Sequence, residues 1–141
     1  MNRVTTGMLL ALAILAGCAR GVKMESPPPK LIHVSGSVSY RERIALPPNA
    51  LVDVRLVDTS AEGGAAEIAR DVIEAAGKQP PYSYSLSYHP REIVAEHDYV
   101  VRAQITVDGR VWFQSQAPAP VITKNHPTTA DLVLVRAPQN P

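Results

Sequence analysis

The side chains that could do chemistry in this 141-residue chain are few and widely separated. The chain holds one cysteine, Cys18, and four histidines with no H-x-x-H or H-E-x-x-H spacing, so the pattern predicts no zinc site. These histidines are His33, His89, His97 and His126. No G-x-S-x-G motif, phosphate-binding glycine loop or G-x-G-x-x-G motif occurs either. We therefore predict no catalytic residues, no metal and no cofactor.

One stretch, Glu96-His97-Asp98, places acids and a base side by side. Neighbouring residues of a strand point to opposite faces, so this stretch is expected to be a polar loop before a strand. The serines that alternate with tyrosines between Tyr82 and Tyr88 have no histidine at a recognisable spacing to activate them. The sequence therefore favours a non-enzymatic function.

The single cysteine follows a short apolar segment near the start of the chain. Residues 8–16 are uncharged and mostly apolar, and Arg3 precedes them. These nine positions are far fewer than the roughly 20 that a membrane-spanning helix needs, so the segment is typical of a secretory signal peptide. Leu15–Cys18 (LAGC) resembles the lipobox of bacterial lipoproteins, which implies cleavage before Cys18 and a diacylglycerol on its sulfur. The alternative is an ordinary signal peptide in which the cysteine is incidental.

Cysteine usage supports the lipoprotein interpretation. A single thiol cannot form an internal disulfide in the oxidising compartment that an exported protein enters. Each buried methylene contributes about 0.8 kcal/mol, so the diacylglycerol and N-acyl chains of a lipoprotein, palmitate among them, hold a protein firmly on a membrane. In lipoproteins an aspartate after the cysteine tends to retain the protein at the inner membrane. Ala19 occupies that position here, so the resemblance implies the outer membrane, facing the periplasm.

The chain divides into four predicted segments. We expect a signal peptide at residues 1–17, a lipidated cysteine and proline-rich tether at 18–30, one folded domain at 31–136 and a flexible tail at 137–141. Of the 14 Lys and Arg residues only Arg3 lies in the signal peptide, so 13 remain against 13 Asp and Glu. This balance argues against nucleic-acid binding and against attraction to a membrane through a basic patch.

Apolar and polar residues alternate through most of the domain, which predicts strands. The clearest case is residues 82–88, where tyrosines and a leucine alternate with serines. Proline- and glycine-rich turns separate the alternating stretches, so we predict an all-β fold: a single compact antiparallel β-sandwich of about seven strands. The tyrosines are expected to fill its core with their hydroxyls at the rim, and the alternative is that they line a ligand groove. The other alternating stretches are residues 31–40, 51–58, 98–107, 111–115 and 131–136.

Residues 65–77 fit two kinds of structure. They are rich in alanine and carry charges at helical spacings, including Glu67, Arg70 and Asp71, so local propensity favours a helix. Ile73 also alternates with its polar neighbours as in a strand, and the periodicity alone does not decide between the two.

The turn at Asp108–Gly109 determines which residues of the following strand face the core. A two-residue turn would place Val111 and Phe113 on the polar face. A three-residue loop at 107–109, with its glycine left-handed in a bulge, shifts the register by one and buries both, at roughly 1.5–3 kcal/mol for each side chain. We therefore predict the three-residue loop.

That register turns Trp112 outward, beside Gln104 and Gln114. An exposed tryptophan is a candidate contact residue because such rings dominate binding hot spots. We predict these three residues as the contact site for a partner. The alternative is that the tryptophan ring is tucked under a neighbouring loop.

Three stretches in order resemble the YbaY/YscW family of bacterial lipoproteins. They are GSVSYRERIALPPNALVDVRLVD at 36–58, YSLSYHPREI at 84–93 and DYVVRAQITVDGRVWF at 98–113, and Tyr40–Pro48 is the most specific element. The resemblance covers nearly all of residues 31–136. It implies a lipid-anchored β-sandwich with no catalytic residues, and a strand across 68–73, which we adopt over the helix. The better-studied branch comprises type III secretion pilotins, which escort a secretin subunit to the outer membrane.

These observations predict a non-enzymatic, outer-membrane-anchored lipoprotein that acts as a pilotin-like chaperone or as an envelope protein-interaction module. Its partner would be an outer-membrane protein or a secretin subunit, bound through an extended segment that pairs with a sheet edge. The alternative is a small-molecule binding module that contacts a sugar or lipid headgroup through the tyrosines or Trp112.

Overall fold

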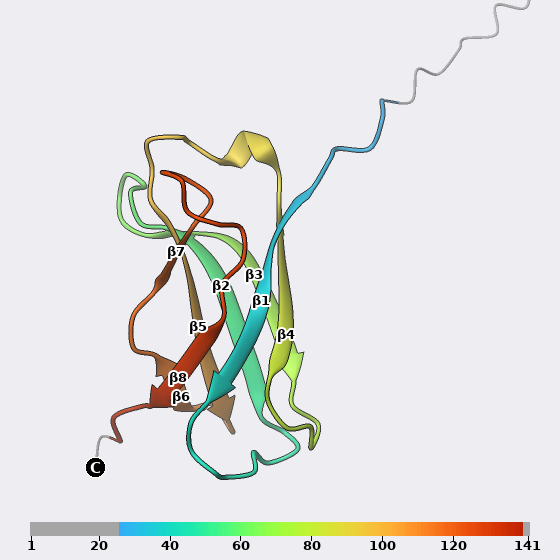
Figure 1. Cartoon of the computed structure of the whole chain (residues 1–141), viewed down its shortest axis with the longest axis vertical. Helices are drawn as coiled ribbons and strands as arrows, with labels where there is room; N and C mark the ends of the chain where they lie inside the picture. Colours follow the sequence, from blue (N-terminus) through green and yellow to red (C-terminus); the bar gives the residue numbers. More distant parts are fainter. Residues whose placement is uncertain (1–25, 140–141) are drawn as a thin grey trace, which may run out of the picture.

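The computed structural model describes residues 26–139, and its fold is all-β, which confirms the predicted fold class. All strands belong to one sheet with the order β3-β2-β5-β6-β8-β1-β4, and β7 pairs with β5 outside this path (Figure 1). The elements are β1 (Ile32–Tyr40), β2 (Leu51–Asp58), β3 (Ala66–Glu74), β4 (Tyr82–Tyr88), the 3-10 turn η1 (Pro90–Glu92), β5 (Tyr99–Val107), β6 (Arg110–Ser115), β7 (Ala119–Val121) and β8 (Leu132–Arg136).

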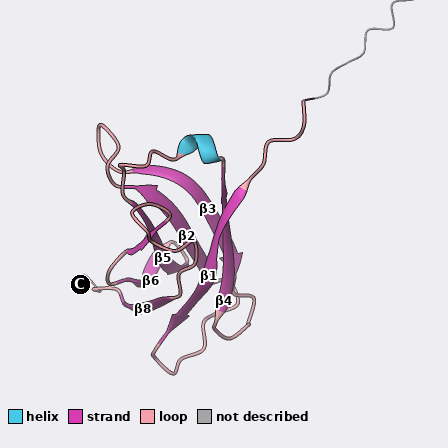
Figure 2. Ribbon diagram, turned by 45° about the horizontal axis from the view of Figure 1, so that its top comes forward, coloured by secondary structure: helices cyan, strands magenta, loops and turns pink. Residues whose placement is uncertain are grey.

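The sheet curls until its two end strands, β3 and β4, lie next to each other (Figures 1 and 2). The backbone N–H of Ser85 in β4 donates to Asp71 Oδ2 of β3 at 3.0 Å. Within residues 26–139 no backbone ladder joins these two strands, so the sheet is nearly, but not fully, closed. The pair β1 and β8 is parallel, with Val38 opposite Leu132. The antiparallel sandwich that we expected is therefore a mixed sheet wrapped around one core.

The stretch with helical propensity is a strand. β3 pairs with β2 from Leu51 opposite Glu74 to Asp58 opposite Ala66. This ladder satisfies the backbone of β3, and Ile73 packs against the core, so the tertiary context outweighs the preference of the alanines for a helix. The strand that the family resemblance implied at residues 68–73 is confirmed.

The tyrosines of β4 fill the core and do not line a groove. Tyr82, Tyr84 and Tyr88 are all buried. The Tyr82 hydroxyl donates to the Lys78 carbonyl at 2.8 Å and the Tyr84 hydroxyl donates to the Ala130 carbonyl at 2.6 Å. Burial raises the pKa of Tyr82 and of Tyr84 to about 12, so both hydroxyls stay protonated and act as donors.

The turn between β5 and β6 corrects the prediction for this hairpin. The turn contains two residues, Asp108 with φ 50° and Gly109 with φ 76°, and Val107 pairs directly with Arg110. Two successive left-handed residues form a turn whose twist matches that of the flanking strands. The predicted three-residue loop is wrong.

The register shift that buries the aromatic residue of β6 occurs inside the strand. Ile105 pairs with Phe113 and Thr106 pairs with Val111, so Trp112 is one extra residue that forms a β-bulge. Phe113 is fully buried, as expected. Val111 is only half-buried opposite Thr106, and its predicted place in the core is wrong. A bulge at this position buries the phenylalanine and leaves the favoured turn unstrained.

Candidate functional site

The structure brings together two of the predicted contact residues. Gln104 and Gln114 lie directly opposite each other on β5 and β6. Trp112 is half-buried and packs against the core, and its backbone carbonyl accepts a hydrogen bond from Ala137 N at 2.9 Å. The contact role of these three residues stays a prediction. Cys18 lies outside the described residues.

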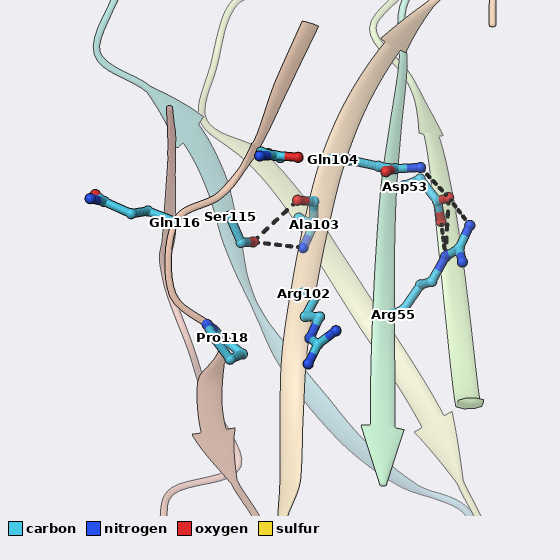
Figure 3. Close-up of a pocket in the computed structure, with 9 residues that line it drawn as sticks. Asp53, Arg55, Arg102, Ala103, Gln104, Ser115, Gln116 and Pro118 are labelled. Carbon is cyan, nitrogen blue, oxygen red and sulfur yellow. Dashed lines mark hydrogen bonds and ion pairs between the residues drawn. The ribbon is translucent and has the colours of Figure 1, made fainter. Parts of the chain in front are cut away.

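Both glutamines line a pocket of about 450 Å³ on the outer face of the sheet (Figure 3). Its walls come from β2, β5, β6 and the segment that follows β6. The lining is mostly polar, so the pocket is suited to hydrogen bonds and charge rather than to an apolar ligand. The polar residues that line it are Asp53, Arg55, Arg102, Gln104, Gln114, Ser115 and Gln116.

The pocket forms where the partner of β5 changes. β6 ends at Ser115 and β7 begins at Ala119, with Pro118, which has no backbone N–H, between them. The Ser115 hydroxyl forms the hydrogen bonds that a neighbouring strand would otherwise form with Ala103. Ala103 N donates to Ser115 Oγ at 2.8 Å, and Ser115 Oγ donates to Ala103 O at 3.1 Å (Figure 3). This satisfies the β5 backbone and leaves space beside it.

A buried carboxylate, Asp53, lies at one side of the pocket. The residue is 4% exposed although it belongs to the outer face. Arg55 Nη2 donates to Asp53 at 2.7 Å, and Arg70 donates through Nε at 2.8 Å and Nη2 at 3.0 Å. Burial raises the pKa of Asp53, but the hydrogen bonds and charges of the two arginines outweigh burial and lower it overall. Asp53 is therefore ionised at neutral pH.

Replacing Asp53 with asparagine should lower the free energy of unfolding at neutral pH by about 2 kcal/mol, between the values for exposed and fully buried ion pairs. Because the folded-state pKa is lowered, the advantage of the carboxylate is complete above the unfolded pKa of about 4. It is lost as the pH falls further through the folded pKa. Urea unfolding of both proteins between pH 7 and pH 3 measures this difference.

The matched control is Asp98→Asn, because Asp98 pairs with Lys124 at 2.7 Å between two exposed side chains. This exposed pair contributes no more than about 1 kcal/mol. Equal effects of the two substitutions at neutral pH, or a difference for Asp53→Asn that grows on acidification, would contradict the ion-pair argument.

A second buried carboxylate joins two loops. Asp58 Oδ2 lies 2.7 Å from His97 Nδ1, and Asp58 Oδ1 accepts from Ser60 N at 2.9 Å. Burial raises the pKa of Asp58, but hydrogen bonds from His97 and Ser60 lower it overall. The His97 carbonyl also accepts from Thr123 Oγ1 at 2.6 Å. The Glu96-His97-Asp98 stretch, expected as a polar loop, is thus tied to β2 and to the loop after β7.

The structure also places a histidine beside two serines. His33 Nδ1 lies 2.9 Å from Ser87 Oγ and 3.5 Å from Ser85 Oγ, because β1 pairs with β4 and sets His33 opposite Ser87. The sequence did not predict this contact, since it depends on the pairing of two distant strands. The three residues are exposed and lie outside the pocket, and no described carboxylate hydrogen-bonds to His33 to orient it. The contact therefore lacks the third member of a hydrolase site.

Residues 26–139 contain neither a candidate metal site nor a helix that could span a membrane. No cluster of three or more His, Cys, Asp or Glu side chains in this range could hold a metal ion. None of the helical segments described is long and apolar enough to cross a membrane.

Residues 29–134 match the family model for the type III secretion system lipoprotein chaperone (YscW). The chain belongs to the YscW family. The resemblance to this family predicted from the sequence is confirmed. The uncharacterized lipoprotein YbaY of Escherichia coli (strain K12) is 30% identical over 151 residues, which cover 96% of this chain and 79% of YbaY.

A solved structure also matches this YscW family member. It is that of an alternative pilotin from the type II secretion system of Vibrio cholerae, with a TM-score of 0.73 and 38% sequence identity. The match covers 78% of this chain and 100% of the pilotin chain. Family membership and this likeness support a non-enzymatic lipoprotein role.

Proposed function

We propose that this chain is an outer-membrane lipoprotein, anchored through lipid on Cys18 and facing the periplasm, that chaperones an outer-membrane protein or a secretin subunit. The observation that carries the proposal is the 38% identity to a secretion pilotin across the whole of that pilotin's chain. A pilotin-like role needs a folded domain held near the membrane and a surface free to bind another protein.

The ends of the domain are compatible with such an anchor. Residues 26–31 precede β1 and extend away from the sheet, toward the upper right of Figure 1, and they do not line the pocket. The 13 residues from Cys18 to Lys30 reach about 40 Å when extended at about 3.1 Å per residue, as proline-rich spacers are. A lipid on Cys18 would thus hold the domain near the bilayer and leave the pocket accessible.

The outer face around Gln104 and Gln114 is the contact surface in this proposal. The end strands β3 and β4 face each other, and the backbone N–H of Ser85 on the edge of β4 already donates a hydrogen bond to Asp71 of β3. A partner strand therefore has less open edge to pair with than the sequence suggested. The pocket offers polar side chains instead, among them Arg102, which forms no ion pair within residues 26–139.

Replacing Cys18 with serine should abolish the attachment of lipid. We expect the wild-type protein to take up labelled palmitate and to fractionate with the outer membrane, and Cys18→Ser to lose both properties, because serine supplies no thiol for the thioether. Metabolic labelling followed by separation of the two membranes measures the outcome. Substitution of the preceding Gly17 by alanine, a residue of similar size, is the control and should keep the label. A wild-type protein that remains unlabelled and soluble in the periplasm would refute the anchor.

A further inference from the structure

Three arginines form one row across the outer face of the sheet. Arg55 of β2 lies opposite Arg70 of β3 on one side and opposite Arg102 of β5 on the other. Like charges directly opposite each other destabilise a sheet unless counter-charges lie nearby. The position of those counter-charges determines how much positive charge is left for a ligand.

Two of the three guanidinium groups are engaged within the protein. Asp53 accepts hydrogen bonds from both Arg55 and Arg70, and Glu67 lies 3.6 Å from Arg55. Among the ion pairs formed within residues 26–139, none includes Arg102. Three positive charges against two negative charges leave one positive charge, and it resides on Arg102, which lines the pocket together with Arg55.

Two side-chain amides line the same pocket as the Arg102 guanidinium. Gln104 and Gln114 occupy the next row of the sheet, and Figure 3 shows Arg102 between Pro118 and Arg55, with Gln104 reaching toward Asp53. The contact from Gln104 Nε2 to Asp53 Oδ2 is long, at 3.5 Å, and the described part of the chain provides no hydrogen bond to the Gln114 amide. The pocket thus presents, besides Arg55, an arginine that forms no ion pair among the described residues and two side-chain amides on the next row.

Exposed apolar side chains flank this polar centre. Val72 of β3 lies opposite Asp53 and is 46% exposed, and Val135 of β8 lies opposite Gln114 and is 37% exposed. Single exposed valines are ordinary on protein surfaces. On the row of the two glutamines they provide apolar contacts on both sides of the polar groups, as a protein interface does.

From this arrangement we infer that the pocket binds the carboxylate of a glutamate or aspartate side chain in an extended segment of the partner protein. Arg102 forms the ion pair with this carboxylate, and the amides of Gln104 and Gln114 on the neighbouring row can donate to carbonyl groups of the same segment. The inference rests on the proposed chaperone function, which supplies a protein partner. A phosphate dianion fits less well because Asp53 and Glu67 pair with Arg55, which lies opposite Arg102, and they repel a second negative charge.

Isothermal titration calorimetry on the full chain in dodecyl maltoside micelles tests this inference with two pentapeptides. Both are acetylated and amidated, so their ends carry no charge; one reads Val-Glu-Val-Glu-Val and the other has glutamine in place of each glutamate. We expect the acidic peptide to bind about tenfold more tightly, because hydrogen bonds between two charged groups are about twice as strong as neutral ones. Equal affinities, or no binding by either peptide, would overturn the inference.

Substitution of Arg102 ties this preference to the pocket. Arg102→Gln should remove the tenfold preference and leave the melting temperature unchanged, since Arg102 forms no ion pair within the described residues. Arg91→Gln, an exposed arginine of η1 outside the pocket, should keep the preference. A preference that survives Arg102→Gln would overturn the inference. If glutarate binds as tightly as the acidic peptide, the inference that the ligand is a protein segment is wrong. The pocket would then be a site for small carboxylates.

These experiments test the pocket proposal and the lipid-anchor proposal separately. The Cys18→Ser chain should show the same peptide preference as wild type, because the pocket is built by residues 53–118. Loss of the preference with intact palmitate labelling contradicts the pocket alone. Loss of labelling with an intact preference contradicts the anchor alone.

Discussion

Replacing Phe113 with alanine is expected to lower the free energy of unfolding by about 3–5 kcal/mol, the largest effect of any change considered for this protein. Phe113 is fully buried, and its ring stacks on Tyr40 with centroids 4.7 Å apart. The Arg136 guanidinium lies 5.5 Å from the centroid of the same ring. The bulge at Trp112 shifts the register of β6 so that the Phe113 ring points into the core. The substitution removes this ring and leaves the bulge without the burial that it makes possible.

Chemical denaturation monitored by far-ultraviolet circular dichroism measures this change. A domain of this size loses about 4 °C of melting temperature for each kcal/mol, so Phe113→Ala should melt at least about 12 °C below wild type. Val111→Ala on the same strand is the control, since Val111 is half-buried outside the core, and it should cost well under half as much. Similar losses for both variants would contradict the observed bulge and favour the register with both side chains buried.

Gly36→Ala is expected to destabilise the domain by about 3 kcal/mol, the upper end for inserting one methyl group into a packed site. A Cβ at Gly36 would lie 1.8 Å from the backbone oxygen of Ala130 and 3.0 Å from the Tyr84 hydroxyl. The backbone cannot easily move away, because Ser35 N donates to the Thr128 carbonyl at 3.1 Å and Ala130 N donates to the Ser35 carbonyl at 3.0 Å. The methyl group would therefore break the contact between β1 and the segment before β8.

Ser35→Ala is the matched control for this substitution. It introduces alanine at the adjacent position of β1, where the side chain is exposed, and leaves the backbone bonds of Ser35 in place. We expect a change within about 0.5 kcal/mol, as for surface substitutions in general. If Gly36→Ala unfolds at the same urea concentration as Ser35→Ala, the close approach of the Ala130 carbonyl to β1 is wrong.

Local patterns in the sequence were sufficient for the fold class, because alternation reports which face of a strand is buried. Tyr82–Tyr88 alternates without a break, and the structure buries its tyrosines and Leu86 and exposes its serines. The same argument failed for β3, Ala66–Glu74, because alanine has little preference for either face and its helical propensity is overridden by pairing with β2. The periodicity allowed both a helix and a strand there, and the family resemblance decided for the strand.

The hairpin shows a second limit of local reasoning. The burial of Phe113 was correctly predicted, since it follows from the energy of burying an aromatic ring. The position of the extra residue did not follow, because a bulge in the loop and a bulge at Trp112 bury the same ring equally well. The strand pairing of the whole sheet, including Ala137 N bonded to Trp112 O, distinguishes them.

The candidate site was predictable only in part. Gln104 and Gln114 were identified as the neighbours of Trp112 on the outer face of the expected hairpin, and the observed hairpin sets the two glutamines opposite each other. The arginine row was not identifiable, since Arg55, Arg70 and Arg102 come from three strands and align only through two ladders. The charge left on Arg102 also depends on which arginines Asp53 engages, and that is a property of the folded sheet.

The most direct test of the chaperone proposal is the abundance of proteins in the outer membrane of the native host. Quantitative mass spectrometry would compare a strain lacking this chain with strains complemented by wild type or by Cys18→Ser. We predict that at least one outer-membrane protein falls in the deletion strain and recovers with wild type but not with Cys18→Ser. An unchanged outer-membrane proteome in the deletion strain, or full recovery with Cys18→Ser, would contradict an escort role that depends on the lipid anchor.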